Sequence, residues 1–353
     1  MSGQLVGDRP RLRVAVMGAG SIGCYVGGRL AKTCDVTLIG RRDAMDAIAQ
    51  RGLTLGSPGQ PSETIPAGTI AVTTTVDGAH GADIVLVTVK SASTTEAGRE
   101  LAPVLAPGAM VISFQNGLHN ATRLRASLES RGMANAVLAG MVAFNVVQPA
   151  AATYLRATSG EVMVERHEGT AAFLEAADRA GMPIRARDDM REVQHAKLLM
   201  NLNNAVNALS GLPLKEELGQ RDYRRVLALC QEEGLTVFAR KGVAPARLGP
   251  IPPEATVRLL RCPDPVFKAL AASSLKVEAT ARSSMADDLA LGRRTEIDEL
   301  QGEVARLGAE HGIPTPACDR IVGLVRKAEA DGPANLPAWS GPALLQEVTD
   351  HRG

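Results

Sequence analysis

Short apolar runs alternate with amphipathic stretches along the first half of the chain. Four runs are almost continuously apolar, a pattern typical of buried parallel strands rather than of strands with one solvent-facing side. The apolar runs are residues 11–18, 35–40, 83–90 and 109–117, and the helical stretches between them are residues 21–32, 93–105 and 119–130. This alternation of strand and helix predicts a doubly wound α/β fold.

Three further strand-like runs follow and are expected to extend the same sheet. They are residues 137–147, 153–159 and 161–166. Earlier in the chain, the stretch from Gly56 to Gly68 is rich in Gly and Pro, which indicates a loop or a hairpin insertion.

From about Asp189 onward the apolar positions recur with helical spacing, and turn signals divide the pattern. These signals are Gly211, Gly242, the Pro-Ile-Pro-Pro cluster at 250–253 and Gly-Ile-Pro at 312–314. We therefore predict an α/β domain over residues 1–188 and an all-helical domain over residues 189–332. The tail, residues 333–353, is rich in Pro and Gly at its start and is expected to be irregular.

Composition excludes several classes of protein. The formal net charge of +1 over 353 residues argues against a nucleic-acid binder, because such a protein needs a basic face. No apolar run approaches the roughly 20 residues of a membrane span, and residues 1–13 lack the apolar core of a secretory signal. The five cysteines include no CxxC pair and the six histidines form no ligand cluster, so no metal site is predicted. We expect a cytoplasmic protein that handles small molecules and contacts neither nucleic acid nor membrane.

A glycine-rich motif lies between the first predicted strand and the helical stretch that follows it. The motif consists of Gly18, Ala19, Gly20, Ser21, Ile22 and Gly23. In a GxGxxG motif of this kind the first glycine permits a tight turn, the second lets backbone approach a pyrophosphate, and the third lets the helix pack on the strand. The helix N-terminus supplies amides and a dipole for the anion. The motif predicts a Rossmann-type dinucleotide site, and the alternative is a glycine-rich turn without a ligand.

The residues after the second predicted strand indicate which dinucleotide binds. An NAD enzyme would carry Asp or Glu here to hold the ribose hydroxyls, whereas this chain has Arg41 and Arg42. Guanidinium groups bind a 2′-phosphate in bidentate fashion, so NADP(H) is the expected cofactor. A solvated basic turn is the alternative.

An asparagine-rich stretch in the helical half carries the strongest sign of catalytic chemistry. On a helix of about 100° per residue, Lys197, Asn201 and Asn204 fall on one face. The other side is apolar, with Leu198, Leu199, Leu202 and Val206. Asn is a poor helix former, and such local conflicts concentrate at functional sites. A lysine among amides can act as proton donor to a carbonyl, and the alternative is a surface lysine whose stem covers apolar neighbours.

A second group of polar residues lies about ninety positions further along, at Ser283-Ser284 and at Thr295-Glu296. Thr295 can cap a helix with Glu296 in its first turn, where the helix dipole favours an acid. A serine pair before two aspartates is more typical of a turn or a cap than of a binding site. These residues therefore do not establish a site on their own.

These motifs together resemble the ketopantoate reductase (2-dehydropantoate 2-reductase) family over most of the chain. Each motif is weak alone, but six in the same order are hard to produce by chance. The six are Gly18 to Gly23, Lys90 at the end of a strand, Asn116-Gly117, Lys197-Leu198 with Asn201, Ser283-Ser284-Met285, and Thr295-Glu296-Ile297-Asp298. The resemblance implies a Rossmann-type NADP-binding domain followed by a helical catalytic domain.

The resemblance also implies roles for the catalytic and cofactor-binding residues. Lys197 matches the family's proton donor. Glu296 matches the acid that helps to orient donor, cofactor and substrate. Lys90 and Asn116 match residues that hold the dinucleotide, and Asn116 also matches a group near the reacting carbonyl.

On the substrate side, Asn201 matches a contact to the substrate hydroxyl and Ser284 a contact to its carboxylate. One position departs from the family pattern, because Ala205 stands where many members carry an asparagine two turns after the lysine. Asn204 lies on nearly the same face and is expected to take over the contact, with Asn207 as the alternative.

The sequence supports three hypotheses about function. The first is NADPH-dependent reduction of 2-dehydropantoate (ketopantoate) to pantoate by hydride transfer to the C2 keto group, as in pantothenate biosynthesis. The second, favoured by Ala205, is a paralogue that reduces another small 2-oxo acid. The third is a dinucleotide-binding sensor without turnover, and the presence of both Lys197 and Glu296 argues against it. The sequence leaves the oligomeric state open, and a homodimer is one arrangement consistent with it.

Overall fold

The structure is a computed structural model that describes residues 11–270 and 281–350. Residues 1–10, where no secretory signal was expected, and residues 351–353 of the tail lie outside the described residues. Within the two described segments, no helix combines the length and the apolar character that crossing a bilayer requires.

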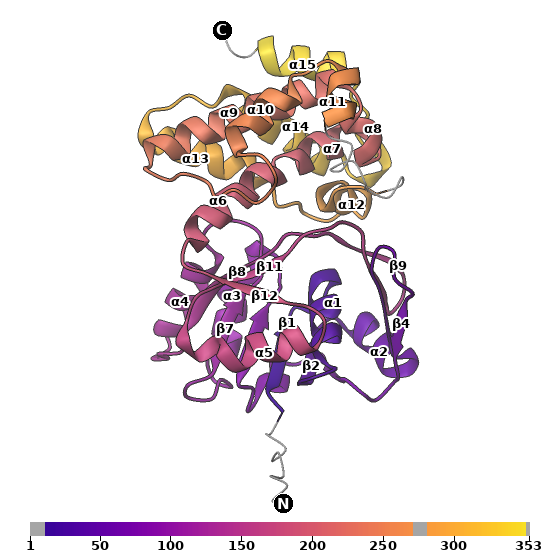
Figure 1. The fold of residues 1–353 in the computed structure, drawn as a ribbon, viewed down its shortest axis with the longest axis vertical. Helices are drawn as coiled ribbons and strands as arrows, with labels where there is room; N and C mark the ends of the chain where they lie inside the picture. The colour runs from indigo at the N-terminus through magenta and orange to yellow at the C-terminus, as the bar shows by residue number, and fades with distance from the viewer. Residues whose placement is uncertain (1–10, 271–280, 351–353) are drawn as a thin grey trace, which may run out of the picture. The chain divides into compact units, whose positions relative to one another are not determined.

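The chain divides into two compact units (Figure 1). Unit 1 comprises Met1–Gln115 and Asn120–Asp188, and unit 2 comprises Asn116–His119 and Asp189–Gly353. The division after Asp188 separates the strand-containing part of the chain from the helical part. The four-residue loop Asn116–His119, which we call the crossing loop, belongs to unit 2 although its neighbours in sequence belong to unit 1.

Unit 1 is built on an eight-stranded sheet with the strand order β12-β11-β8-β7-β6-β1-β2-β5. Every neighbouring pair is parallel except β8 and β11. The strands are β1 (Arg13–Met17), β2 (Asp35–Ile39), β5 (Ala71–Thr73), β6 (Ile84–Val87), β7 (Met110–Ser113), β8 (Val137–Val142), β11 (Val162–Glu165) and β12 (Ile184–Arg187). Because β2 and β6 flank β1 on opposite sides, the order reverses beside β1. Such a switch point is where open α/β sheets bind ligands.

A smaller sheet of four strands, in the order β4-β3-β10-β9, completes the β-structure of the described residues. Its members are β3 (Leu53–Gly56), β4 (Glu63–Ile65), β9 (Val146–Ala150) and β10 (Thr153–Arg156). The antiparallel pairing of β3 with β4 confirms the hairpin alternative for residues 56–68. The expectation that residues 153–159 extend the main sheet is wrong. The left-handed turn at Ala152 (φ 59°) folds β10 back on β9, and β10 then pairs with β3.

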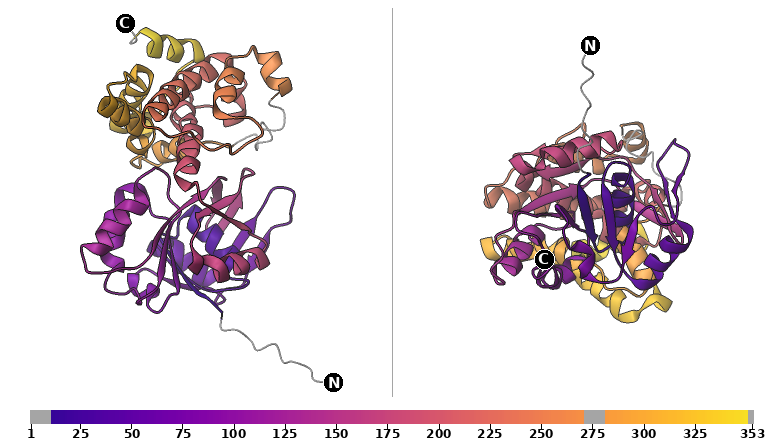
Figure 2. Two further views of the ribbon diagram at one scale, coloured as in Figure 1. Left: turned by 60° about the vertical axis from the view of Figure 1, so that its left-hand side comes forward. Right: turned by 90° about the horizontal axis from the view of Figure 1, so that it is seen from below.

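Helices cover both faces of the main sheet (Figure 2). The α-helices of unit 1 are α1 (Ser21–Leu30), α2 (Arg42–Arg51), α3 (Thr94–Leu101), α4 (Asn120–Glu129) and α5 (Ala171–Arg179). Helix α1 packs on β1, β2 and α5, whereas α3 packs on α4, which contacts β7 and β8. The predicted doubly wound fold is confirmed, and the end of β1 with the start of α1 lies at its switch point.

The described part of unit 2 contains helices but no strands. They are α6 (Met190–Asn201), α7 (Asn203–Ser210), α8 (Leu214–Leu218), α9 (Arg221–Arg240), α10 (Pro253–Leu260), α11 (Asp264–Leu270), α12 (Ser284–Ala290), α13 (Gln301–His311), α14 (Pro316–Asp331) and α15 (Gly341–Asp350). The long helix α9 packs against most of the others. Gly211, Gly242 and Gly312 end helices with positive φ angles of 69°, 72° and 67°, as the sequence predicts for helix-terminating glycines.

The C-terminal tail differs from the expectation. Residues 341–350 form α15, so the prediction of an irregular tail is wrong there. Leu344 and Val348 are fully buried, and α15 packs on α9 and α14. Their i, i+4 spacing gives the segment an apolar face, and burial of that face outweighs the Pro- and Gly-rich stretch before it.

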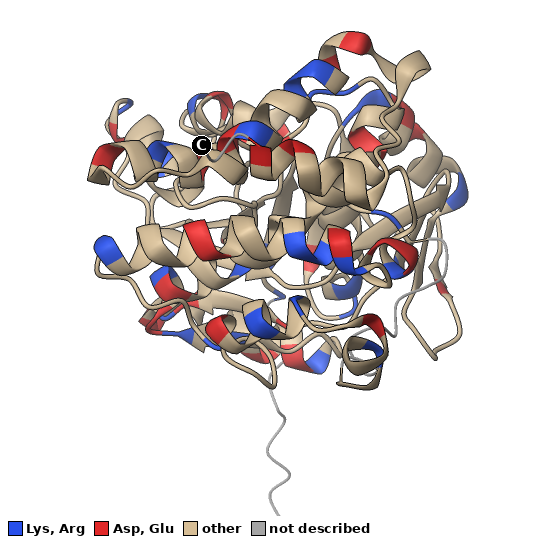
Figure 3. Cartoon of the chain, turned by 90° about the horizontal axis from the view of Figure 1, so that it is seen from above, with Lys and Arg blue, Asp and Glu red and all other residues tan. Residues whose placement is uncertain are grey.

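Charged residues of both signs are intermingled on the face shown in Figure 3. Ion pairs within unit 2 include Arg320 with Glu347 and Arg326 with Asp298. Among the residues drawn in that view, no helix presents a stripe of a single sign. Charges of alternating sign largely cancel one another's field at a distance.

Candidate functional site

The glycine-rich turn passes tightly between the ends of β2 and β6. The amides of Gly18 and Ala19 both donate to the carbonyl of Ile39, at 3.0 and 2.8 Å. Gly18 has a φ of 92°, and a Cβ added there would lie 2.5 Å from Val89 Cγ1. A glycine is therefore required at position 18 by the protein itself.

The other two glycines of the motif have different surroundings. A Cβ on Gly23 would lie 2.5 Å from Thr88 Oγ1, whereas a Cβ on Gly20 would meet nothing closer than the carbonyl oxygen of Gly18 at 3.9 Å. The protein leaves open the space in front of Gly20, where the motif brings backbone against a pyrophosphate. Gly20 also caps α1 without a side chain, so the first-turn amides remain available to an anion. The described residues fit a bound dinucleotide.

Two cationic residues lie at the strand ends beside this turn. Arg41 follows β2, is exposed, and caps α2. Within the described part of the chain, its guanidinium has no hydrogen bond or ion pair, so it is available to a phosphate. Lys90 is exposed two residues after Thr88, whose hydroxyl donates to the Gly18 carbonyl at 2.8 Å. The predicted cofactor residues of unit 1 therefore gather at one edge of the sheet.

A buried polar network that no sequence motif indicates flanks the crossing loop in unit 1. Gln115 Nε2 donates to the Val89 carbonyl (2.9 Å) and to Thr94 Oγ1 (2.7 Å), and this hydroxyl donates to Asn120 Oδ1 (2.8 Å). Gln115, Thr94 and Asn120 are all buried. The only sequence signal was the Gln-Asn pair after an apolar strand. The network fixes the two ends of the crossing loop.

Three predicted site residues from distant parts of the chain meet in unit 2. Asn201 Nδ2 donates to Asn116 Oδ1 at 3.1 Å, and Asn116 Nδ2 donates to Glu296 Oε2 at 3.0 Å. Asn116 lies in the crossing loop, Asn201 is the last residue of α6, and Glu296 precedes the short 3-10 helix Ile297–Glu299. We call this hydrogen-bonded series the amide relay. Its geometry orients both amides and the carboxylate.

Lys197 lies one turn before Asn201 on α6. Its side chain is largely withdrawn from solvent, and burial lowers the pKa of its amine from 10.5 to about 8. Within the described residues the amine has no hydrogen-bond or ion-pair partner. Lys197 is thus a cation whose proton is unusually easy to remove, as a general acid near neutral pH requires.

The sequence pattern predicts one helix from Lys197 through the asparagine-rich segment, but the structure has two helices there. Helix α6 ends at Asn201 and α7 begins at Asn203. Two buried glutamines donate to carbonyls at this interruption, Gln301 to Leu202 at 2.7 Å and Gln231 to Leu199 at 3.0 Å. The apolar residues predicted for the other face are all buried. Nothing in the local pattern pointed to the glutamines, which come from α13 and α9.

Two of the asparagines of α7 are structural. Asn203 Nδ2 donates to the buried carboxyl of Glu217 at 3.1 Å. Asn207 is fully buried, donates to the Leu212 carbonyl at 2.9 Å and accepts from the Ser283 amide at 2.9 Å. Because Asn207 is fully buried within unit 2, the alternative in which it contacts a substrate is not supported.

Asn204 is the one residue of Asn203–Ser210 that is not buried. Within the described part of the chain, no hydrogen bond involves its side-chain amide. Ala205 is fully buried and faces the core. The Ser283 hydroxyl donates to the Asn204 carbonyl at 2.9 Å, and the exposed Ser284 follows at the start of α12. Asn204 and Ser284 therefore belong to the same part of unit 2.

The capping expectation for Thr295 and Glu296 is met only in part. Thr295 Oγ1 accepts from the Ile297 amide at 3.3 Å, so Thr295 does stabilise a helix start. That helix is a single 3-10 turn, and α13 begins only at Gln301. Glu296 therefore does not lie in the first turn of an α-helix, and its carboxylate binds Asn116 instead.

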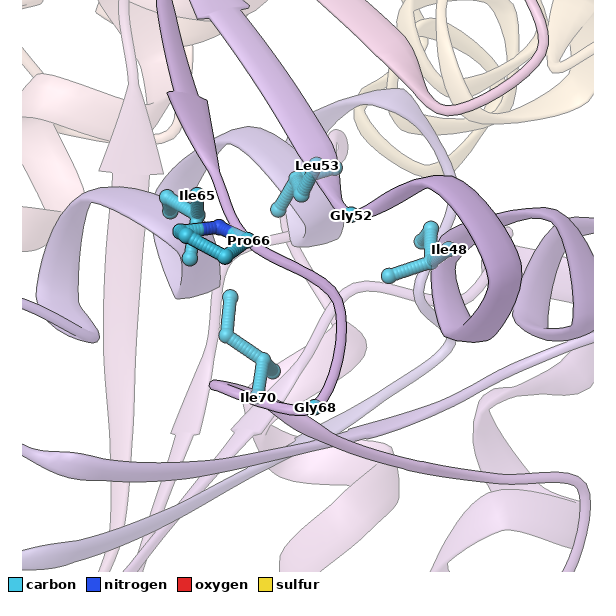
Figure 4. Close-up of a pocket in the computed structure, with 7 residues that line it drawn as sticks. All are labelled: Ile48, Gly52, Leu53, Ile65, Pro66, Gly68 and Ile70. Atoms are coloured by element: carbon cyan, nitrogen blue, oxygen red, sulfur yellow. The ribbon is translucent and has the colours of Figure 1, made fainter.

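A small pocket in unit 1 does not qualify as a ligand site (Figure 4). Its empty space is about 150 Å³, which includes space open to solvent, and this is below the roughly 300 Å³ at which ligand pockets begin. The side chains that line it are apolar, and Ile48, Leu53, Ile65 and Ile70 are the largest of them. Among the described residues there is also no group of three or more His, Cys, Asp or Glu that could hold a metal ion.

Comparison with known proteins shows similarity along nearly the whole chain. The family model described as Ketopantoate reductase PanE/ApbA matches residues 14–169, and the one described as Ketopantoate reductase PanE/ApbA C terminal matches residues 189–329. The 2-dehydropantoate 2-reductase of Halobacterium salinarum is 31% identical over 329 residues, which cover 91% of this chain and 100% of that protein.

Solved structures show the same fold. A PanE/ApbA family ketopantoate reductase from Ralstonia eutropha JMP134 is 31% identical with a TM-score of 0.76, covering 91% of this chain and 99% of that one. D-mandelate dehydrogenase, solved with NADH and anilino(oxo)acetate, has a TM-score of 0.74 over 91% of this chain and 99% of its own. Its identity of 17% limits that likeness to the fold.

Proposed function

Because this chain belongs to the ketopantoate reductase family, we propose that it is an NADPH-dependent enzyme that reduces 2-dehydropantoate to pantoate. The family consists of oxidoreductases that act on a keto or hydroxyl group. The observation that carries the specific proposal is the amide relay, in which Asn201, Asn116 and Glu296 are hydrogen-bonded one helical turn from Lys197.

The residues of unit 2 supply the proton side of the reaction. The dinucleotide, when bound, supplies the hydride that adds to C2 of the keto acid. Lys197 Nζ holds the proton that passes to the keto oxygen as negative charge develops there. A lysine pKa of about 8 keeps the ammonium form dominant at neutral pH while bringing its acidity closer to the operating pH than an ordinary lysine allows.

The amide relay is expected to align the groups around this proton transfer. The Asn116 amide nitrogen donates to Glu296, and the Asn116 amide oxygen accepts from Asn201. The Asn116 amide therefore cannot turn freely. A fixed amide presents the same hydrogen-bonding atoms to every ligand, which limits reorganisation during the reaction. In this proposal Asn116 contacts the dinucleotide and the reacting carbonyl, and Asn201 contacts the substrate hydroxyl.

The preference for NADPH over NADH rests on Arg41. Its exposed guanidinium follows β2 and is unpaired within the described residues. The position is the one at which an acidic residue would hold a ribose in an NAD enzyme. A 2′-phosphate satisfies an unpaired guanidinium, whereas a bare ribose does not.

Asn204 and Ser284 are assigned to the substrate. Both present polar side chains in a part of unit 2 where the neighbouring asparagines are already engaged. We assign the Ser284 hydroxyl to the substrate carboxylate, and the Asn204 amide to the same substrate hydroxyl that Asn201 contacts. These contacts suit a small 2-oxo acid that carries a hydroxyl group, as 2-dehydropantoate does.

One observation favours a second candidate, a reductase of another small 2-oxo acid. Ala205 is buried and offers no hydrogen bond, so Asn204 is the one amide of α7 that remains for a distal hydroxyl. A substrate without that hydroxyl would lose only this contact, because Asn204 is partly exposed and its amide can bond to water instead.

The test is a comparison of substrates with the purified protein. NADPH consumption is measured with 2-dehydropantoate and with 2-oxo acids of similar bulk that lack the hydroxyl, and the product is identified by mass spectrometry. We expect the highest kcat/KM for 2-dehydropantoate and pantoate as product. A higher kcat/KM for another 2-oxo acid would establish the second candidate, and NADPH binding without turnover on any of them would establish a sensor.

The cellular setting and the assembly stay predictions. All five cysteines are free thiols and four of them are buried, which is consistent with the reducing cytoplasm that we propose for the protein. A homodimer is tested by light scattering of the purified protein.

A further inference from the structure

The crossing loop has an unusual position in the chain. Gln115 and Asn120, on either side of it, are buried in the polar network of unit 1. The four residues between them, Asn116–His119, belong instead to unit 2. Gly117, at φ 91°, supplies the left-handed turn within this short segment. A glycine adopts this conformation without the strain that another residue would incur.

Two polar side chains attach the crossing loop to unit 2, and Leu118 packs against the hydrophobic core of that unit. Asn116, at its start, binds Asn201 and Glu296 through the amide relay. His119, at its end, binds Glu303 on α13, with 2.8 Å between His119 Nε2 and Glu303 Oε1. All four residues of the loop are only partly buried, so the two polar contacts add to the packing of Leu118 in holding it.

The acceptor of the His119 contact is itself fixed. Glu303 is 4% exposed and receives Arg306 in bidentate fashion, Nη2 to Oε1 at 2.6 Å and Nε to Oε2 at 2.9 Å. Burial alone would raise the pKa of Glu303, but the hydrogen bonds from His119 and Arg306 lower it to about 2. The carboxylate therefore stays ionised and immobile beside the loop.

We propose that His119 is a positioning residue for the reaction. Its bond to Glu303 holds the crossing loop on unit 2 and thereby keeps the Asn116 amide aligned with Asn201 and Glu296. His119 acts through Asn116 and is not assigned a contact with substrate or cofactor. The inference rests on the proposed function, because it takes Asn116 as the group that contacts the dinucleotide and the reacting carbonyl.

Removal of the His119 contact should loosen the loop without unfolding either unit. The flanking residues Gln115 and Asn120 keep their buried hydrogen bonds, and Glu303 keeps Arg306. The loop would then keep Asn116 and the packing of Leu118 on unit 2, but it would lose the polar contact at its end. A segment with few buried contacts and one polar attachment opens locally more often than its surroundings.

The first test measures amide hydrogen exchange in peptides that span residues 114–121. His119→Ala should exchange faster there than the wild type, while peptides from β1 remain unchanged. His119→Gln should restore protection, because its side-chain amide can place a donor close to the position of the imidazole nitrogen. The matched control is His311→Ala, which removes an exposed histidine at the end of α13 and should leave exchange in the loop unchanged.

The second test measures function in the same variants. His119→Ala should weaken NADPH binding by about threefold to tenfold, the range that corresponds to one net hydrogen bond. It should also lower kcat by about tenfold to a hundredfold, as small misplacements in active sites do. His119→Gln should recover most of both losses, and His311→Ala should show neither.

The two readouts separate this inference from the proposed function. Loop exchange and NADPH affinity need no turnover, so they decide the role of His119 even if 2-dehydropantoate proves not to be the substrate. Unchanged loop exchange in His119→Ala overturns the inference. It is also overturned if the loop exchanges faster while NADPH affinity and kcat stay at wild-type values.

Discussion

A rise in pH should switch off the reaction through Lys197. Burial lowers the pKa of this lysine from 10.5 to about 8, and the proposed mechanism needs the protonated form. Above that pKa the fraction of protonated enzyme falls about tenfold per pH unit, so kcat/KM should fall with the same slope. An ordinary lysine would place the decline more than two units higher.

The same shift has a consequence for stability. The decrease of the Lys197 pKa from 10.5 to about 8 changes the free energy of unfolding by about 3 kcal/mol, at about 1.36 kcal/mol per pKa unit. This value is an upper bound because the side chain is partly exposed to solvent. Between these two pH values the unfolded chain holds a proton that the folded chain has lost. The Lys197 contribution to the free energy of unfolding should therefore increase with pH across this window, while activity decreases.

The assay is kcat/KM for 2-dehydropantoate as a function of pH, with NADPH saturating. The wild type and Lys327→Ala, which removes an exposed lysine on α14, should both decline above a pH of about 8. Lys197→Ala should be slower by about two to four orders of magnitude, without that decline and with nearly normal NADPH binding. A wild-type profile that stays flat to a pH of about 10, or a Lys197→Ala variant with near-normal turnover, would refute the reasoning.

Four further predictions follow from other parts of the structure. Arg41→Ala should raise KM for NADPH far more than for NADH, and equal losses for both would contradict the assignment of Arg41. Gly20→Ala should weaken NADPH binding at unchanged Tm, because its Cβ lies 3.9 Å from the nearest neighbour, whereas Gly18→Ala, with a contact of 2.5 Å, should lower Tm as well. Asn204→Ala should raise KM for 2-dehydropantoate but spare a 2-oxo acid without the hydroxyl, and equal losses would make Asn204 structural. Burial raises the pKa of Glu217 from 4.5 to about 8, so its contribution to stability is lost as pH rises through that range; urea titrations should show that Glu217→Gln removes this loss.

Local spacing in the sequence was sufficient for the main features of both units. The alternation of apolar runs and helical stretches predicted the doubly wound sheet, and the glycine motif after β1 marked its switch point, because both depend on residues close together in the chain. The spacing of Lys197 and Asn201 likewise placed them one helical turn apart on α6. These predictions use only the periods of helices and strands.

Long-range contacts decided the rest. Asn116 and Glu296 are 180 positions apart in the chain, and the assignment of the crossing loop to unit 2 depends on contacts of this kind. Asn203, Asn204 and Asn207 look alike in sequence, yet buried partners from other elements engage the first and the last. Periodicity shows which face of an element a residue occupies, but not which residue of another element meets it there. That choice depends on how the packed helices satisfy their buried polar groups, and only the tertiary structure contains it.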